Sequence, residues 1–216
     1  MSDFAATTQN RVRRIPARGH YDKAVIYPII DEALICHVGF VEDGLPYVIP
    51  TIHARSGDKL IFHGAKASRM MKQIASGATI CVTFTLLDGL VLARSTFHHS
   101  MNYRSVVLFG QGRPLTDEAE KLAALEVLTE HLAHGRWPDT RQPNAKELKA
   151  TAVAELTIES ASAKIRSGPP GDDDEDYALP IWAGVLPIQQ QYLPPIDDPQ
   201  LSEGLRAPEY IVNYRR

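Results

Sequence analysis

Between residues 34 and 115, short apolar runs alternate with tight polar turns, and this pattern constrains the fold more than any other feature. The runs cover Leu34–Val41, Tyr47–Ala54, Lys59–His63, Thr79–Leu86, Leu90–Arg94 and Ser100–Leu115. Asp-Gly pairs at 43–44 and 88–89 and the triplet at 56–58 separate neighbouring runs. Apolar runs divided by such turns are typical of antiparallel hairpins. With a further strand at Ala152–Arg166, the sequence predicts six to seven strands.

Helical periodicity accompanies these strands. Apolar residues recur at helical spacing from Val25 to Leu34, after Asp22, a predicted N-cap. Further helices are expected at Ala67–Ala75, Thr116–Leu132 and Asn144–Ala150. Hairpin-connected strands with a few helices predict an α+β fold, in the form of a small antiparallel β-barrel with peripheral helices.

The two ends of the chain differ from its body. Residues 1–20 are polar and basic and are expected to form an arm over the domain surface or over a partner subunit. Residues 21–192 hold the barrel domain, and the proline-containing residues 193–216 are predicted to be an extended strap of open role. The acidic, Pro- and Gly-containing segment Ser167–Tyr177 is predicted to be a mobile loop.

Composition excludes several classes of protein. A chain of 216 residues with 44% hydrophobic and 23% charged residues is typical of one globular domain. A net charge of −3 gives no reason to expect nucleic acid. No apolar run reaches the roughly 18 residues that a membrane helix requires, and the N-terminus lacks a secretory pattern. Cys36 and Cys81 lie in apolar runs and are expected to be free thiols, so a cytoplasmic location is predicted.

The start of the run at Ser100–Gly110 concentrates hydrogen-bonding side chains at the mouth of a strand. An Arg and a Ser in this position suit the binding of an anion or a heterocycle, because Arg offers a planar fork of donors. A solvated edge strand explains the same residues equally well.

Four stretches together carry a family resemblance: RVRRIPARGHYD, HVGFVEDGLPYVIPTIH, HGAKASRM and DGLVLARSTFHHSMNYRSVVLFG. In this order and spacing they resemble the pyridoxamine 5'-phosphate oxidase-like FMN-binding split-barrel proteins, in particular the flavin-nucleotide-binding branch that contains nitroimidazole-resistance proteins. The resemblance runs from about Arg11 to Pro187. It implies a homodimer of split β-barrels with FMN in a cleft between the subunits.

The resemblance also implies site residues. A strand running along the flavin ring bonds the ring edge through backbone groups of Val48, Ile49, Pro50 and Thr51. Phe62 and His63 lie beside the isoalloxazine, and Ser68 and Arg69 bind the phosphate. Met70 stands where the family often has a Lys, for which Lys66 or Lys72 are the possible substitutes.

The second group of implied contacts comes from the strand of the other subunit and from the C-terminal region. Arg104 and Ser105 match the strand that reaches the flavin, and Tyr103 either stacks on the ring or packs at the dimer seam. Trp182 matches an aromatic residue near the cofactor. The oxidases carry an Arg after that Trp, but residues 183–195 contain none, which argues against pyridoxamine phosphate oxidation.

Two functions of different class follow as expectations. The first is an FMN-dependent oxidoreductase that reduces a small aromatic or nitro compound with electrons from NAD(P)H or another reductant. The second is a flavin- or haem-binding module without turnover, with His63, His98 or His99 as an axial ligand. The deazaflavin F420 is a further alternative cofactor.

The sequence identifies no catalytic dyad and no metal site. His98 and His99 are adjacent, so a strand would direct them to opposite faces. The acidic run Asp172–Asp176 lacks the ligand spacing of a calcium loop and is expected to be solvated.

Overall fold

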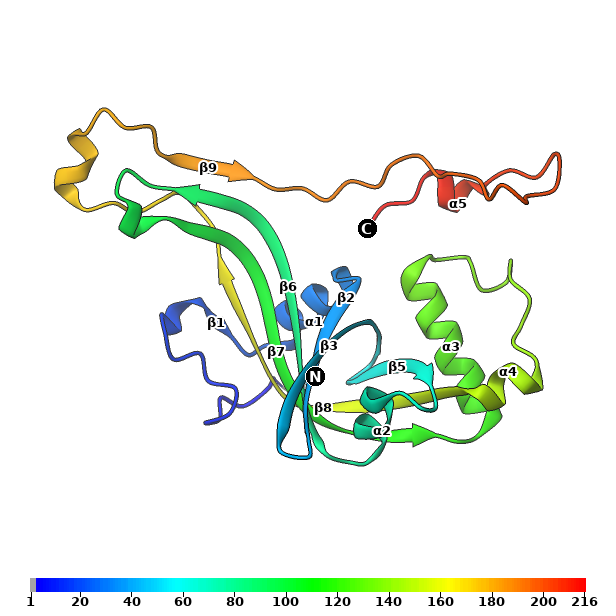
Figure 1. Ribbon diagram of the computed structural model, residues 1–216. Coiled ribbons are helices and arrows are strands. Elements are labelled where there is room, and N and C mark those ends of the chain that lie inside the picture. Colours follow the sequence, from blue (N-terminus) through cyan, green and yellow to red (C-terminus); the bar gives the residue numbers. More distant parts are fainter. Residues whose placement is uncertain (1–2) are drawn as a thin grey trace.

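One antiparallel sheet forms the body of the molecule in the computed structural model, which describes residues 3–216 (Figure 1). Its strands are β1 (Gly19–His20), β2 (Ile35–Glu42), β3 (Leu45–Ile52), β4 (Ala54–Ser56), β5 (Lys59–Ala65), β6 (Thr79–Leu92), β7 (Ser100–Leu115), β8 (Thr151–Arg166) and β9 (Gly184–Pro187). The strand order is β3-β2-β6-β7-β8-β5-β4, with β1 on β8 and β9 on β6. Only His53 separates β3 from β4, so the two ends of this order meet and the sheet curls into a barrel-like body.

The α+β class and the antiparallel hairpins are confirmed, but the sheet has nine strands. The additional strands β1, β4 and β9 contain two, three and four residues and are too short to leave a periodic sequence signal. The runs at 79–86 and 90–94 were expected to be separate strands, and this prediction is wrong: they form the single strand β6.

The predicted tight turn at Asp88-Gly89 is a β-bulge within β6, where the pairing register with β7 shifts between Leu87 and Gly89. Gly89 pairs with Asn102 on one side and with Pro187 of β9 on the other. A Cβ at Gly89 would lie 3.0 Å from the carbonyl oxygen of Leu186. The glycine therefore serves the close approach of a third strand, which the local sequence does not reveal.

The inner face of the sheet holds the larger of two apolar cores. Ile80, Val82 and Phe84 of β6 are fully buried there, and the intervening side chains point outward, as alternation along a strand requires. Helix α1 (Lys23–Glu32) contributes its apolar side to this core, and helix α2 (Arg69–Ala75) contributes Met70, Met71 and Ile74. Asp22 caps α1 as predicted, because its carboxylate accepts the backbone N–H of Val25 at 3.0 Å.

A smaller core lies outside the sheet. Helix α3 (Glu118–Leu132) packs Ala124 and Leu128 against Ile61 of β5 and Val153 of β8. Helix α4 (Ala145–Ala150) follows, and Asn144 closes a capping box at its start. The predicted boundaries of these two helices are confirmed to within about two residues.

Beyond the barrel, β6, β7 and the end of β8 project as a curved extension (Figure 1). The expected mobile loop after β8 contains a short 3-10 helix at Asp174–Ala178 and is held at Asp172. The fully enclosed carboxylate of Asp172 accepts the backbone N–H groups of Arg94 and Ser95 at 2.9 and 3.1 Å. From β9 the tail runs back above the barrel to helix α5 (Glu209–Val212) and returns toward the barrel (Figure 1). Among residues 3–216, no helix is long and apolar enough to span a bilayer.

Candidate functional site

Strand β7 separates two cavities, because its alternate side chains point to opposite faces. Val106 and Leu108 are in the main core, whereas Ser105 and Val107 belong to the other face. The register with β8 places Ser105 opposite Lys164 and Val107 opposite Ser162. This outer face of β7 and β8 forms the floor of the first cavity.

The N-terminal arm covers that floor. Strand β1 pairs with β8, with Gly19 opposite Lys164. Asn10, only 3% exposed, donates from its side chain to the carbonyl oxygen of Ala161 at 3.0 Å and fixes the start of the arm. Between arm and floor lies the arm cavity, of about 260 Å³, lined by residues 9–14 together with Ser105, Val107, Ser162 and Lys164. The arm therefore lies on its own domain, the first of the two positions that the sequence left open.

Arg104 points to the second cavity, of about 570 Å³, between β6–β7 and the tail. Its guanidinium donates to Asp88 at 2.8 Å and to Glu32 at 2.8 Å, and these two carboxylates raise the pKa of Arg104 further. Gln189, Gln190 and Tyr192 of the tail, together with Arg216, line the same space. Arg104 and Ser105, which the sequence predicts to contact the same flavin, thus lie on opposite sides of one strand.

Strand β3 has a free edge in the described part of the chain, residues 3–216, because it ends the strand order and pairs there only with β2. Its exposed Val48 and Pro50 alternate with the half-buried Ile49 and Thr51. An unpaired strand edge offers backbone donors and acceptors at fixed spacing, except at proline. This geometry fits the backbone role that the sequence predicts for residues 48–51.

Arg69 lies beside that strand at the start of α2. Its guanidinium stacks on the ring of Tyr47 at 4.2 Å, and its Nε lies 2.6 Å from the carboxylate of Glu42. Ser68 caps the helix by accepting the backbone N–H of Met71 at 3.4 Å. A phosphate bound by Arg69 would therefore have to share the guanidinium with Glu42.

The other predicted contacts divide into buried and open ones. Phe62 is fully buried in the main core, which leaves only its backbone to meet a ligand. His63 is half-buried on the opposite face of β5, where its Nδ1 has no hydrogen-bond partner in the part of the chain that the structure describes. Burial lowers the pKa of His63, so the imidazole is neutral. Trp182 is 68% exposed and lies in the connection that leads to β9.

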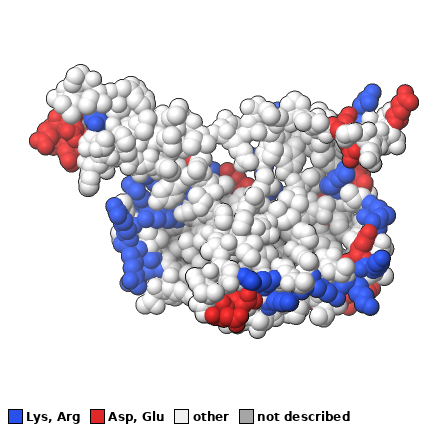
Figure 2. Space-filling model, viewed as in Figure 1, with Lys and Arg blue, Asp and Glu red and all other residues white. Residues whose placement is uncertain are grey.

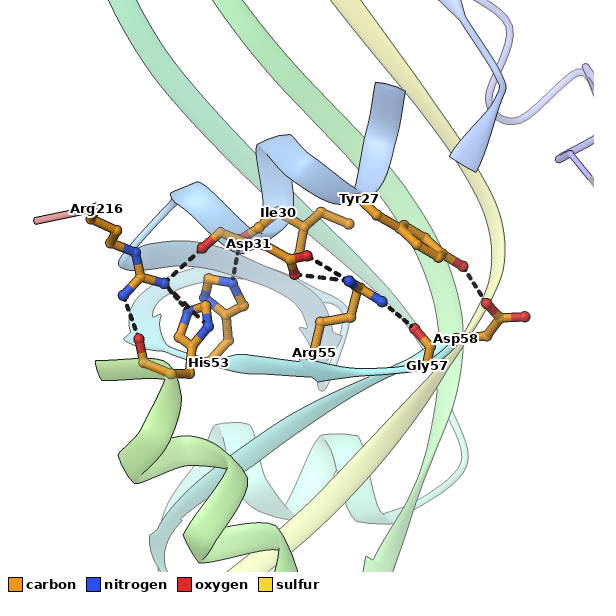
Figure 3. A network of polar contacts seen from close by, with 9 residues as sticks. Tyr27, Ile30, Asp31, His53, Arg55, Gly57, Asp58 and Arg216 are labelled. Carbon is orange, nitrogen blue, oxygen red and sulfur yellow. Dashed lines mark hydrogen bonds and ion pairs between the residues drawn. The ribbon is translucent and has the colours of Figure 1, made fainter. Parts of the chain in front are cut away.

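A polar network under the tail, which the sequence did not predict, connects Arg216 to the ends of two helices (Figure 3). The guanidinium of Arg216 donates to the backbone carbonyls of Asp31 at 2.7 Å and of Glu32 at 3.1 Å, the last residues of α1. It also donates to the carbonyl of His131, near the end of α3. Because the last carbonyls of a helix lack partners, a cation at this position satisfies the ends of both helices. No local sequence pattern could connect residue 216 to residues 31 and 131.

His53 lies beneath this cation. It is fully buried against the rings of Phe84 and His131, and its Nε2 bonds the carbonyl oxygen of Ile30 at 3.0 Å. Burial lowers the pKa of His53 to about 4. The ring is therefore neutral and donates its one proton to the carbonyl oxygen of Ile30, which leaves Nδ1 as a buried lone pair that finds no partner among residues 3–216.

At the tip of the extension, ligand atoms of His98, Asp173 and Asp176 lie within 4.8 Å of one another. The Nε2 of His98 lies within hydrogen-bond distance of the carboxylate of Asp173, at 3.2 Å. The backbone N–H of Ala93 donates to Nδ1 of the neighbouring His99 at 3.0 Å.

Comparison with known proteins gives a consistent result. A family model described as pyridoxamine 5'-phosphate oxidase matches residues 22–165. The structure of the flavocytochrome Anf3 from Azotobacter vinelandii is 42% identical, covers 97% of each chain and superposes with a TM-score of 0.91. The FAD and haem binding protein from Mycobacterium smegmatis is 36% identical over 90% of this chain and 95% of its own, with a TM-score of 0.86.

A candidate 5-nitroimidazole antibiotic resistance protein from Bacteroides thetaiotaomicron VPI-5482 is 24% identical over 68% of this chain and 86% of its own. Its TM-score of 0.57 supports the shared fold alone. A search of curated proteins found no match.

Proposed function

The chain belongs to the pyridoxamine 5'-phosphate oxidase-like family, and from this premise we propose that it is a redox protein that binds both FAD and haem. The observation that carries the proposal is the 42% identity with a flavocytochrome over 97% of both chains. The similarity to a protein that binds FAD and haem supports the same pair of groups. FAD thereby replaces the FMN expected from the sequence.

The flavin part of the proposal uses the free edge of β3 and the start of α2. Backbone groups of residues 48–51 would bond the edge of the ring, and Arg69 would meet a phosphate in exchange for part of its contact with Glu42. Stacking on Tyr47 holds the guanidinium flat, which preserves its fork of donors for a bidentate contact.

The haem part requires a neutral imidazole with a free nitrogen. His63 meets this requirement through Nε2, because its ring is half-buried and, among residues 3–216, only its Nδ1 is fully enclosed while Nε2 forms no hydrogen bond. His98 and His99 each have one ring nitrogen engaged, with Asp173 and with the backbone of Ala93. His53 also has a free Nδ1, but aromatic rings enclose it. His63 is therefore the residue that would hold the haem iron.

The two groups supply complementary chemistry when bound, since a flavin accepts a hydride and a haem iron exchanges single electrons. The contribution of the chain is to bind and orient them and to exclude water, and no side chain has to act as a general base. This role accords better with an electron-carrying module than with a dedicated nitro-compound reductase. NAD(P)H as electron donor and a homodimer with a cleft between subunits remain parts of the proposal.

The test is the absorption spectrum of the purified protein, followed by mass spectrometry of whatever heat releases. We expect flavin bands, an intense Soret band and released FAD. The His63→Gln variant should lose the Soret band and retain the flavin, whereas the matched His99→Gln variant should keep both. Arg69→Ala should weaken flavin retention after gel filtration. A colourless protein that takes up neither FAD nor haem would refute the proposal.

A further inference from the structure

The arm cavity is surrounded by positive charge. Its cationic residues come from the arm and from β8: Arg11, Arg13, Arg14 and Lys164. Among residues 3–216, none of these four cations forms an ion pair. Figure 2 shows a band of Lys and Arg atoms over the N-terminal segment, with no acidic atoms among them. Like charges that gather without counter-charges create a local positive potential, which an anion would relieve.

A buried guanidinium adjoins this cluster and is an independent observation. Arg166 follows Lys164 by two positions on β8 and is 8% exposed. Within the described residues 3–216, it donates only to neutral oxygens, those of Asn102, Gly168 and Pro169, and its buried Nε has no partner there. Burial and the nearby charge of Arg18 lower the pKa of Arg166. A buried cation without a carboxylate partner is costly, and the charge of Arg18 adds to that cost.

The dimensions and donors define the ligand. A volume of about 260 Å³ is below the usual size of a site for a whole cofactor and admits a part of one. Guanidinium forks match phosphate oxygens, and the hydroxyl of Ser162 lines the same space, whereas the hydroxyl of Ser105 donates to the carbonyl oxygen of Lys164 at 3.2 Å. A group with several phosphate oxygens meets this set of donors better than a single carboxylate does.

We propose that the N-terminal arm and the outer face of β7 and β8 form a subsite for the diphosphate of a dinucleotide. The choice of a dinucleotide rests on the proposed function. Two dinucleotides carry this chemistry: NADPH as electron donor, and FAD, whose diphosphate distinguishes it from FMN and would then lie between this subsite and Arg69 of the partner subunit in the proposed homodimer. Ser105, which the sequence predicts to lie near the flavin, belongs to this subsite, while Arg104 does not.

The experiment compares the purified full chain with the double variant Arg13→Ala/Arg14→Ala. Both residues are exposed, so the fold should tolerate their replacement. The matched control, Lys146→Ala/Arg206→Ala, removes the same charge from exposed positions that do not line the cavity and that form no ion pair within residues 3–216. A third variant, Arg13→Lys/Arg14→Lys, keeps the charge and removes the planar forks. The measurements are FAD retention, and calorimetric binding of NADPH and of inorganic diphosphate.

If FAD occupies the subsite, the alanine pair should retain about tenfold less FAD than wild type, and the control pair should retain as much as wild type. If NADPH occupies it, binding of NADPH and of inorganic diphosphate should fall by a similar factor while FAD is retained. The lysine pair should recover part of either loss. Equal values for the alanine pair and its control in all three measurements would overturn the inference. A protein that binds no flavin but loses diphosphate affinity in the alanine pair would refute the proposed function and leave the subsite standing.

Discussion

Acid should destabilise this protein through the buried imidazole of His53. The ring is fully buried, and its pKa is lowered from 6.5 to about 4. In the unfolded chain the same imidazole has its ordinary pKa of about 6.5. Between these values the unfolded state binds a proton that the folded state does not, so the free energy of unfolding must fall as the pH falls.

The magnitude follows from the two pKa values. Lowering the pH from 7.5 to 5.0 should reduce the free energy of unfolding by about 2 kcal/mol through His53 alone, and the full loss near pH 4 approaches about 3 kcal/mol. His63 and His131 also have lowered pKa values because of burial, and they act in the same direction. Carboxylates with lowered pKa, such as Asp58, lose their contribution only at more acidic pH. The range from pH 7.5 to 5.0 therefore isolates the histidines.

Urea denaturation at several pH values, with wild type and His53→Gln compared in the same buffers, measures this effect. Glutamine retains a donor for the carbonyl of Ile30 but cannot titrate. The variant should be less stable at pH 7.5 and should lose about 2 kcal/mol less than wild type on acidification to pH 5.0. Identical pH dependence in the two proteins, or a nuclear magnetic resonance titration of His53 near pH 6.5, would refute the reasoning.

Three further predictions concern the frame around the two cavities. Arg216→Ala should lower the free energy of unfolding by about 1–2 kcal/mol, because three helix-end carbonyls lose a charged donor. Limited proteolysis should then cut the tail faster. An unchanged melting temperature and an unchanged cleavage rate would contradict this prediction. Gly110→Ala should cost about 3 kcal/mol or more, since its Cβ would lie 1.8 Å from the carbonyl oxygen of Thr157, whereas Gly171→Ala, with nothing within 4 Å, should be neutral in the same thermal melts. Asp172→Ala should accelerate hydrogen exchange of the amides of Arg94 and Ser95, and unchanged protection there would show that another contact holds the loop.

Local signals predicted much of the fold. The strand at Ser100–Leu115 and the helix after Asp22 lie close to their expected boundaries. Alternation, helical spacing and an N-cap are signals that depend only on residues near one another in the sequence. The bulge at Gly89 shows the limit of such signals. An Asp-Gly pair encodes a tight turn when its neighbours are two strands, and the third strand β9 that changes the outcome lies almost a hundred residues away.

The candidate site was predictable to a similar degree. Tyr103, Arg104 and Ser105 lie in the expected strand, but adjacent residues of a strand face opposite sides, and that rule alone would have separated Arg104 from Ser105. The arm cavity and the contacts of Arg216 had no such signal, because they join segments that are far apart in the sequence. Which of the predicted residues meet a cofactor remains a prediction.

The alternation of the β7 side chains between two cavities has a consequence for engineering. Odd-numbered positions such as 105 and 107 line the arm cavity, and the even-numbered position 104 lines the cavity under the tail. Substitutions at odd-numbered positions can therefore change the lining of the arm cavity and leave that of the cavity under the tail unchanged, and the reverse holds for position 104. A single residue inserted into β7 would instead affect both cavities at once. It would turn every following side chain to the opposite face of the strand and so exchange the linings of the two cavities.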